Sequence, residues 1–138
     1  MNTTSAAKEA NLTGLIIFIT TFRIKNGALE EFKEAVRKSM GFLDANGPQL
    51  LAEVCIDESE MRAHGIQIHR DSGSILSHWQ LADPHMRDVM QYTTTTRVDI
   101  YGQPNEAVME GMRRLSSQGA ILSVTPRFVG FSRLPDID

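Results

Sequence analysis

Four histidines stand at positions 64, 69, 78 and 85. An imidazole titrates near pH 6.5, so a histidine in a cavity can take a proton from a substrate as a general base. His69 and His78 flank a turn that contains Gly73, and we expect them to be neighbours on the two strands of a hairpin. This position favours His78, and after it His69, as a functional residue. Both could equally be partly exposed hairpin residues or polar groups at a subunit contact.

Trp79, the single tryptophan, adjoins His78. Its ring suits contact with a flat apolar compound, but a tryptophan on a central strand also serves as core. Tyr92 and Tyr101 carry hydroxyls that could donate to a phenolate or keto oxygen. The alternative for both tyrosines is packing at the surface with the hydroxyl in water.

Methionines recur on the segments with helical periodicity, among them Met86 and Met90. Their flexible thioether side chains suit an adaptable slot for flat apolar ligands, and ordinary core filling explains them equally well. No metal or other cofactor is predicted, because no histidine pair has the spacing of a recognised site on one helix face. His64 and His69 are five residues apart in a predicted strand and would point to opposite faces.

The composition is that of one globular domain, with 138 residues of which 41% are hydrophobic. We expect a disordered leader over 1–11, a domain over 12–134 and a short tail over 135–138. The net charge of −3 favours neither nucleic acid nor an anionic membrane surface as a partner. The run Leu15–Ile19 is too short to cross a bilayer, so we predict a cytoplasmic protein. Cys55, the single cysteine, cannot form an intrachain disulfide, and we expect it to be buried and inert.

Hydrophobic periodicity and turn residues divide the domain into helices and strands. The predicted elements are a strand over 12–24, a helix over 29–43, a helix over 48–61, a hairpin of strands over 64–70 and 75–81, a short helix opening at Asp83-Pro84, a strand over 93–101, a helix around 108–115 and a strand over 120–131. A strand over 50–56 is the alternative to the helix over 48–61, but Leu50-Leu51-Ala52 does not alternate, so the helix is preferred.

This order is a ferredoxin-like β-α-β-β-α-β unit of the α+β class, with an inserted helix and with an extra strand and helix before the last strand. The first and last strands are apolar on both alternating faces, but helices cover only one face of such a sheet. A large apolar sheet face exposed to water would aggregate or find a partner. We therefore predict a homodimer in which two sheets pack face to face as a dimeric α/β barrel.

Several segments carry a resemblance to a known family. They are Leu15–Phe22, Leu29–Leu43, Gly65–Asp71, Ser77-His78-Trp79, Asp83–Met90 and Pro126–Phe131. In these segments the chain resembles the dimeric α/β-barrel proteins of the antibiotic biosynthesis monooxygenase type. The resemblance implies oxidation of polycyclic phenols or quinols by dioxygen without metal or flavin, with the substrate between sheet and helices of one subunit. The stretches 47–63 and 97–119 are more elaborate than the basic unit and could roof or reshape the pocket.

We therefore expect a small cofactor-independent monooxygenase, or a related enzyme, acting on an aromatic or polyketide-like compound. His78 and Trp79 are the predicted catalytic residues, and Tyr92, Tyr101, Met86, Met90 and His69 are the predicted substrate contacts. A second hypothesis is a non-catalytic or stress-associated homodimer that binds a small apolar ligand in the same pocket. A third is a relative of these enzymes whose pocket is filled by its own side chains.

Overall fold

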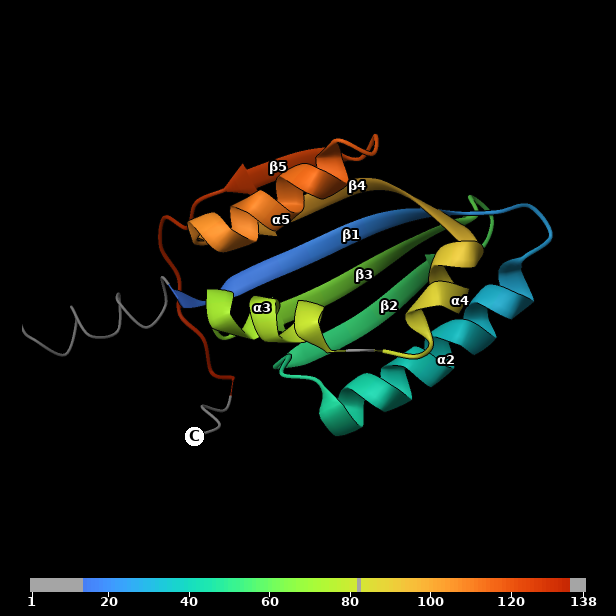
Figure 1. Ribbon diagram of the computed structural model, residues 1–138, viewed down its shortest axis with the longest axis horizontal. Helices are drawn as coiled ribbons and strands as arrows, with labels where there is room; N and C mark the ends of the chain where they lie inside the picture. The colour runs from blue at the N-terminus through green and yellow to red at the C-terminus, as the bar shows by residue number, and fades with distance from the viewer. Residues whose placement is uncertain (1–13, 82, 135–138) are drawn as a thin grey trace, which may run out of the picture.

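The computed structural model describes residues 14–81 and 83–134 (Figure 1). The elements are, in chain order, β1 (Ile16–Ile24), α2 (Leu29–Asn46), β2 (Leu51–Asp57), β3 (Arg62–His69), α3 (Ser72–Gln80), α4 (Met86–Gln91), β4 (Thr93–Tyr101), α5 (Glu106–Ser116) and β5 (Ile121–Thr125). The predicted leader over 1–11 and tail over 135–138 lie outside the described residues. No helix in the described ranges combines the length and the apolar character that crossing a membrane requires.

The strands form one sheet in the order β2-β3-β1-β4-β5. Neighbours are antiparallel except for β4 and β5, which are parallel and are connected by α5. The first four strands in this order are the ferredoxin-like arrangement, and β5 widens the sheet at one edge. The predicted α+β ferredoxin-like fold is confirmed.

The predicted helix over 48–61 is wrong, because this segment is β2 followed by a tight turn into β3. Val54 and Ile56 face the helices, while Glu53, Cys55 and Asp57 alternate to the other face. The Asp57 carboxylate accepts hydrogen bonds from the Ser59 hydroxyl and the Glu60 backbone N–H, which closes the turn. Cys55 is exposed, contrary to the prediction, because it belongs to the outward set of this alternation.

The predicted strand over 75–81 is also wrong, because residues 72–80 form α3. Asp71-Ser72-Gly73-Ser74 is a helix start and not a hairpin turn. The Asp71 carboxylate accepts a hydrogen bond from the Ser74 backbone N–H at 2.9 Å, which is the geometry of an N-cap. The inserted helix and hairpin of the prediction are therefore replaced by a hairpin of β2 and β3 and a helix that follows it.

Two further boundaries differ from the prediction. The last strand ends at Thr125 and not at Phe131, because Pro126 has no N–H to donate to a sheet. Asp83 does not cap a helix directly, since α4 begins at Met86. The extra pair of elements is α5 with β5, at the sheet edge, because β4 completes the basic unit.

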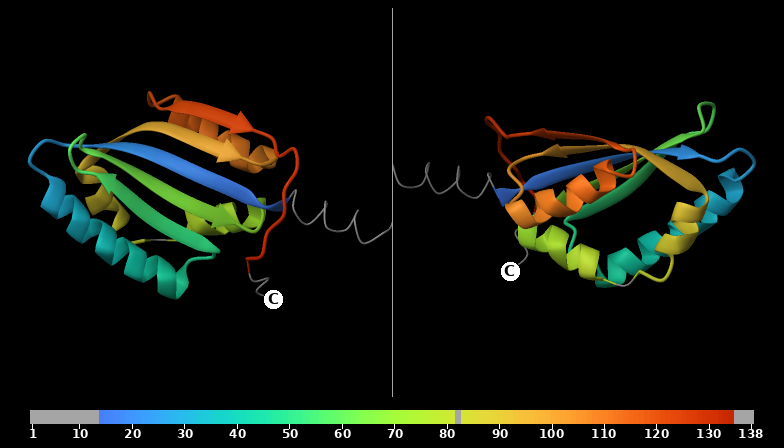
Figure 2. Two further views of the ribbon diagram at one scale, coloured as in Figure 1. Left: turned by 180° about the vertical axis from the view of Figure 1, so that it is seen from behind. Right: turned by 45° about the horizontal axis from the view of Figure 1, so that its top comes forward.

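All four helices that the structure describes pack on one face of the sheet, as the right-hand view of Figure 2 shows. They form two pairs, α3 with α5 and α2 with α4, and each pair covers its own hydrophobic cluster. Phe18 belongs to the cluster under α3 and α5, and Phe22 packs against the cluster under α2 and α4. The helix side of the sheet thus has two small hydrophobic cores, one under each helix pair.

Candidate functional site

An open cavity of about 620 Å³ lies between the two helix pairs and the sheet. It is lined by Phe18, Thr20, Phe22, Gln67, His69, Ile75, His78, Trp79, Leu81, Asp83, Met86, Met90, Gly111, Arg114 and Leu115. Most of this wall is apolar. Its polar groups come from β1, β3, α3, α5 and the connection that precedes α4, and those from β3, α3 and the connection include the two histidines and Asp83. A mostly apolar cavity with a few convergent polar groups is the usual form of a small-molecule site.

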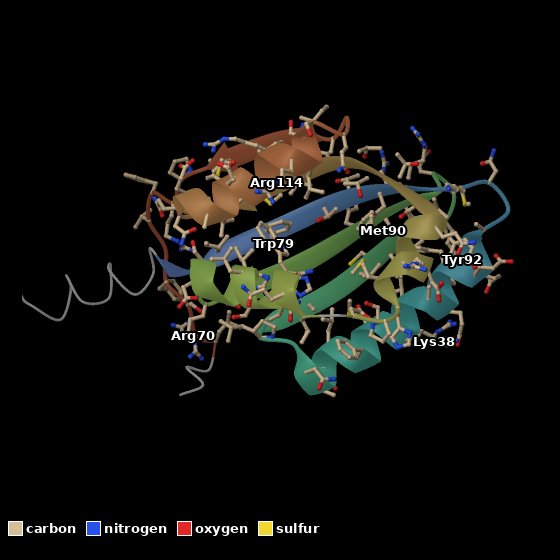
Figure 3. All side chains as sticks on the ribbon, in the orientation of Figure 1. Lys38, Arg70, Trp79, Met90, Tyr92 and Arg114 are labelled. Atoms are coloured by element: carbon tan, nitrogen blue, oxygen red, sulfur yellow. The ribbon has the colours of Figure 1, made fainter. Side chains whose placement is uncertain are left out.

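The cavity brings together most of the residues predicted from the sequence, namely His69, His78, Trp79, Met86 and Met90. Tyr92 and Tyr101 are not among its lining residues. Tyr92 packs against the cluster under α2 and α4, at the far end of α4 in Figure 3. Tyr101 is 42% exposed and is paired with Ile17 on the opposite face of the sheet.

His69 and His78 are neighbours, with ring centroids 5.9 Å apart. They meet because α3 folds back over the end of β3, and not because they share a hairpin. His69 is buried and both of its ring nitrogens have partners. Nδ1 lies 2.7 Å from the Ser74 hydroxyl, and Nε2 lies 2.8 Å from Oε1 of Gln67.

Both imidazoles are held in the neutral form. Burial, with a smaller contribution from the neighbouring His78, lowers the pKa of His69 to about 4, and Asp71 opposes this shift. Burial also lowers the pKa of His78, and Asp83 opposes the shift. A neutral imidazole offers one N–H donor and one lone pair, so at neutral pH each ring can donate one hydrogen bond and accept another.

Two glutamines beside the histidines, Gln49 and Gln67, were missed by the sequence prediction. Nε2 of Gln49 lies 3.1 Å from Nδ1 of His78 and 3.3 Å from Oε1 of Gln67. Gln49 comes from the segment just before β2, which the sequence suggested as a possible roof of the pocket. It contacts His78 but is not itself among the lining residues of the cavity. No sequence signal distinguishes it, because its role depends on where β2 places it.

Trp79 forms a flat wall of the cavity and is 38% exposed. Its ring lies against Gly111 of α5, where a Cβ atom would come within 2.4 Å of Trp79 Cζ3. A glycine inside an amphipathic helix is the sequence signal of such close packing. Figure 3 shows Trp79 and Arg114 on the side of α3 and α5, with Met90 across from them on α4.

The connection between α3 and α4 is fastened by Asp83. Its carboxylate accepts a hydrogen bond from the buried Ser39 hydroxyl at 2.7 Å and another from the His85 backbone N–H at 2.8 Å. These bonds hold the Asp83 carboxyl at the cavity wall and attach the connection to α2. Within the described part of the chain, no three histidine, cysteine or carboxylate side chains are grouped closely enough to hold a metal ion.

The comparisons with known proteins reveal similarity in structure and not in sequence. No protein-family model matches the chain, and no curated protein matches it. MupZ from Pseudomonas fluorescens superposes on 91% of this chain and 99% of its own, with a TM-score of 0.70 and 15% identity. SnoaB, a cofactor-independent oxygenase from Streptomyces nogalater, covers 67% of this chain and 95% of its own, with a TM-score of 0.57 and 13% identity. This chain has the fold of the antibiotic biosynthesis monooxygenase-like proteins.

A third solved structure gives the same result. A candidate antibiotic biosynthesis monooxygenase from Caulobacter crescentus CB15 covers 72% of this chain and 99% of its own, with a TM-score of 0.59 and 10% identity. MupZ matches more of this chain than SnoaB and the Caulobacter protein do. At these identities the likeness establishes the fold, while the chemistry has to be argued from the cavity.

Proposed function

We propose that this chain is a small cofactor-independent oxygenase whose substrate is an aromatic or polyketide-like phenol or quinol. The observation that carries the proposal is the pair of neutral histidines in an apolar cavity beside Trp79. The fold of SnoaB, a cofactor-independent oxygenase, supports it. An electron-rich ring system supplies the electrons for reducing dioxygen itself, so the protein has to bind the ring and manage protons.

In the proposed reaction a ring CH₂ group, present in the keto tautomer of the phenol, is converted to a carbonyl. One atom of dioxygen becomes the carbonyl oxygen, and the other leaves as water with the two hydrogens of the CH₂ group. The ring lies against Trp79, with Met86 and Met90 on the opposite wall. His78 exchanges a proton or a hydrogen bond with the substrate oxygen, while His69 is fully engaged by Ser74 and Gln67 and holds the wall in place.

The first test is a fluorescence titration of Trp79 with naphthols, anthrones and quinols, followed by oxygen-uptake assays with the tightest binders. We expect saturable quenching and oxygen consumption. His78→Ala is expected to lower turnover by about a hundredfold, the size of a lost proton-transfer group. Binding without oxygen uptake would replace the enzyme with a ligand-binding protein, and the absence of both would overturn the proposal.

His64→Ala is the matched control for His78→Ala. His64 lies on the opposite face of the sheet, where its Nδ1 is 3.2 Å from the Thr21 hydroxyl. The substitution His64→Ala removes the same side chain as His78→Ala, at a position that does not line the cavity. Equal losses in the two variants, with both still dimeric, would show that the effect on turnover comes from the fold and not from the cavity.

We further propose that two copies of the chain associate through the open face of the sheet. The centre of this face is apolar and is formed by Ile17 and Ile19 of β1 with Ile66 and Ile68 of β3. These side chains are only half-buried, although they stand on the two central strands. A two-fold axis through this surface would cover it with an identical surface. Sedimentation equilibrium at micromolar concentration is expected to give a dimer, and a monomer of 15.4 kDa would contradict the proposal.

A further inference from the structure

We propose that Gln49 is a positioning residue that fixes which nitrogen of His78 carries the proton. It keeps Nδ1 unprotonated and leaves the proton on Nε2, so that His78 acts as a hydrogen-bond donor to the substrate oxygen that becomes negatively charged. The inference rests on the proposed function and deepens it, because it assigns His78 the part of donor where the sequence suggested a general base.

The Gln49 amide nitrogen makes two close polar contacts. This nitrogen has two protons and no available lone pair, so both of its close contacts are donations. One proton goes to Oε1 of Gln67 at 3.3 Å, and the other goes to Nδ1 of His78 at 3.1 Å. Nδ1 of His78 therefore supplies the lone pair. A neutral imidazole has one N–H group, and in His78 that group is at Nε2.

The orientation of Gln49 agrees with the rest of the chain of polar groups. Oε1 of Gln67 accepts from Gln49 and also lies 2.8 Å from Nε2 of His69, which donates to it. Nδ1 of His69 then accepts from the Ser74 hydroxyl at 2.7 Å. Each donor in this chain meets an acceptor. Turning the Gln49 amide alone would bring its oxygen against the Gln67 oxygen, which is unfavourable for two acceptors.

The backbone beside Gln49 is shaped to receive its amide. A Cβ atom at Gly47 would lie 2.3 Å from Oε1 of Gln49 and 2.9 Å from the Leu43 carbonyl oxygen. The amide therefore occupies space that any other residue at position 47 would fill. Oε1 of Gln49 is buried with no hydrogen-bond partner among the described residues, and this placement costs stability. The arrangement directs the amide nitrogen toward His78 in spite of that cost.

The direct test is a spectrum of the imidazole nitrogens. Two-bond proton–nitrogen correlations distinguish a protonated ring nitrogen from an unprotonated one, and they do so in the protein without substrate. In the wild-type protein we expect His78 to be unprotonated at Nδ1 and protonated at Nε2. Gln49→Met removes the donor and is expected to give a mixture of the two tautomers. Gln49→Glu places an acceptor beside Nδ1 and is expected to move the proton there.

Gln80→Met is the matched control, since Gln80 is an exposed glutamine on the same helix as His78. This variant is expected to leave the His78 tautomer unchanged. A wild-type spectrum with the proton on Nδ1 would overturn the proposal, because both amides would then be reversed and Nε2 would hold the lone pair of a base. An unchanged Nε2–H tautomer in Gln49→Met would overturn it as well.

Turnover and binding provide the second readout. Gln49→Met is expected to lower kcat for an oxidised naphthol by about tenfold, with a smaller change in KM. This is less than the roughly hundredfold to thousandfold loss of a whole oxyanion donor, because part of the Nε2–H tautomer remains. Unchanged kcat together with an altered tautomer would overturn the donor role of His78. If the wild-type protein consumed no oxygen while its tautomer was fixed as expected, the oxygenase proposal would fail and the positioning role of Gln49 would stand.

Discussion

The two faces of the sheet are formed by the same strands, but helices cover one face and leave the other open. On β1, Ile16 and Phe18 point to the helices and are 0% and 8% exposed. Ile17 and Ile19 point the other way and are only half-buried, although they are just as apolar. The covered face combines two hydrophobic clusters with a cavity and a chain of polar side chains. The open face is an apolar centre bordered by charged groups such as Arg97 and Asp99, which form an ion pair at 2.9 Å.

This difference agrees with the proposal that the two faces have separate roles. The covered face contains the hydrophobic clusters of the monomer and the cavity. The open face contributes little to that space, and its apolar character is explained by the proposed association of two copies. A change on one face should therefore affect stability and ligand binding, while a change on the other should affect association.

The largest expected effect is on the covered face, at Phe32. Its side chain is 0% exposed at the centre of the cluster under α2 and α4. Phe32→Ala leaves a cavity and is expected to lower the free energy of unfolding by about 4 kcal/mol, as measured by urea denaturation. Phe128→Ala is the size-matched control, because Phe128 is 97% exposed. Similar losses in the two variants would contradict the assignment of the core to the covered face.

The next effect is on the open face, at Ile66. Ile66 pairs with Ile19 at the centre of the apolar surface. Ile66→Lys would place an unpaired charge in the proposed contact between two copies, and we expect the dissociation constant of the dimer to rise by a hundredfold or more. Gln118→Lys introduces the same charge at an exposed turn and is expected to leave association unchanged. Sedimentation equilibrium measures both, and dimers of equal strength would place the interface elsewhere.

The elements that could be predicted from the sequence are those whose own pattern is unambiguous. The helix at 29–46 has apolar residues at spacings of three and four, and β1 and β4 are rich in β-branched residues. Segment 48–61 failed because its apolar residues fit a helix and a strand about equally well. The segment forms a strand because seven of its residues pair with β3, and the sequence of the segment alone does not reveal this pairing.

The proximity of the two histidines in the site was predicted correctly, but for the wrong structural reason. His69 and His78 were expected to be close as hairpin partners, and they are close because α3 packs back on β3. The predicted hairpin and the observed strand followed by α3 both reverse the chain near Gly73. The two histidines are therefore close in both, although the second element is a helix and not a strand. Gln49 and Gln67 carried no signal, because an ordinary glutamine becomes part of a site only through tertiary placement. Tyr101 does not belong to the site, because the pairing of β4 with β1 places it beside Ile17 on the open face.

The pH dependence of stability gives the third test of the division. The pKa of His69 is lowered to about 4 in the folded state, against about 6.5 in an unfolded chain. Between these values the unfolded chain binds more protons than the folded one, so the stabilisation is complete above pH 6.5 and is lost as the pH falls toward 4. For one such group the loss between pH 7 and pH 5 is about 2 kcal/mol.

His69→Gln removes the titrating ring from the covered face while keeping a hydrogen-bonding side chain. Its free energy of unfolding is expected to fall less steeply between pH 7 and pH 5 than that of the wild-type protein. Urea denaturation at several pH values measures this difference. Parallel curves for the two proteins would mean that burial does not hold His69 neutral.

The smallest expected effect is at Gly111, where α5 contacts the wall of the cavity. Alanine in place of glycine inside a helix is worth up to about 1 kcal/mol of stability. At Gly41 of α2 a Cβ atom would have nothing within 4 Å, so Gly41→Ala is expected to show this gain without other change. At Gly111 the new Cβ atom would lie 2.4 Å from Trp79 Cζ3, so the ring has to move and the gain is offset.

Because Trp79 is the single tryptophan, its emission spectrum reports the move directly. We expect Gly111→Ala to shift the emission and to weaken naphthol binding by about tenfold, the lower end of what one methylene group contributes in an apolar pocket. Gly41→Ala should change neither quantity. If Gly111→Ala bound naphthol as tightly as the wild-type protein while its emission shifted, the Trp79 ring would belong to the packing of α3 against α5 and not to the binding surface. The covered face would then still fold the monomer, but the ligand would have to be placed nearer to His78 and the methionines of α4.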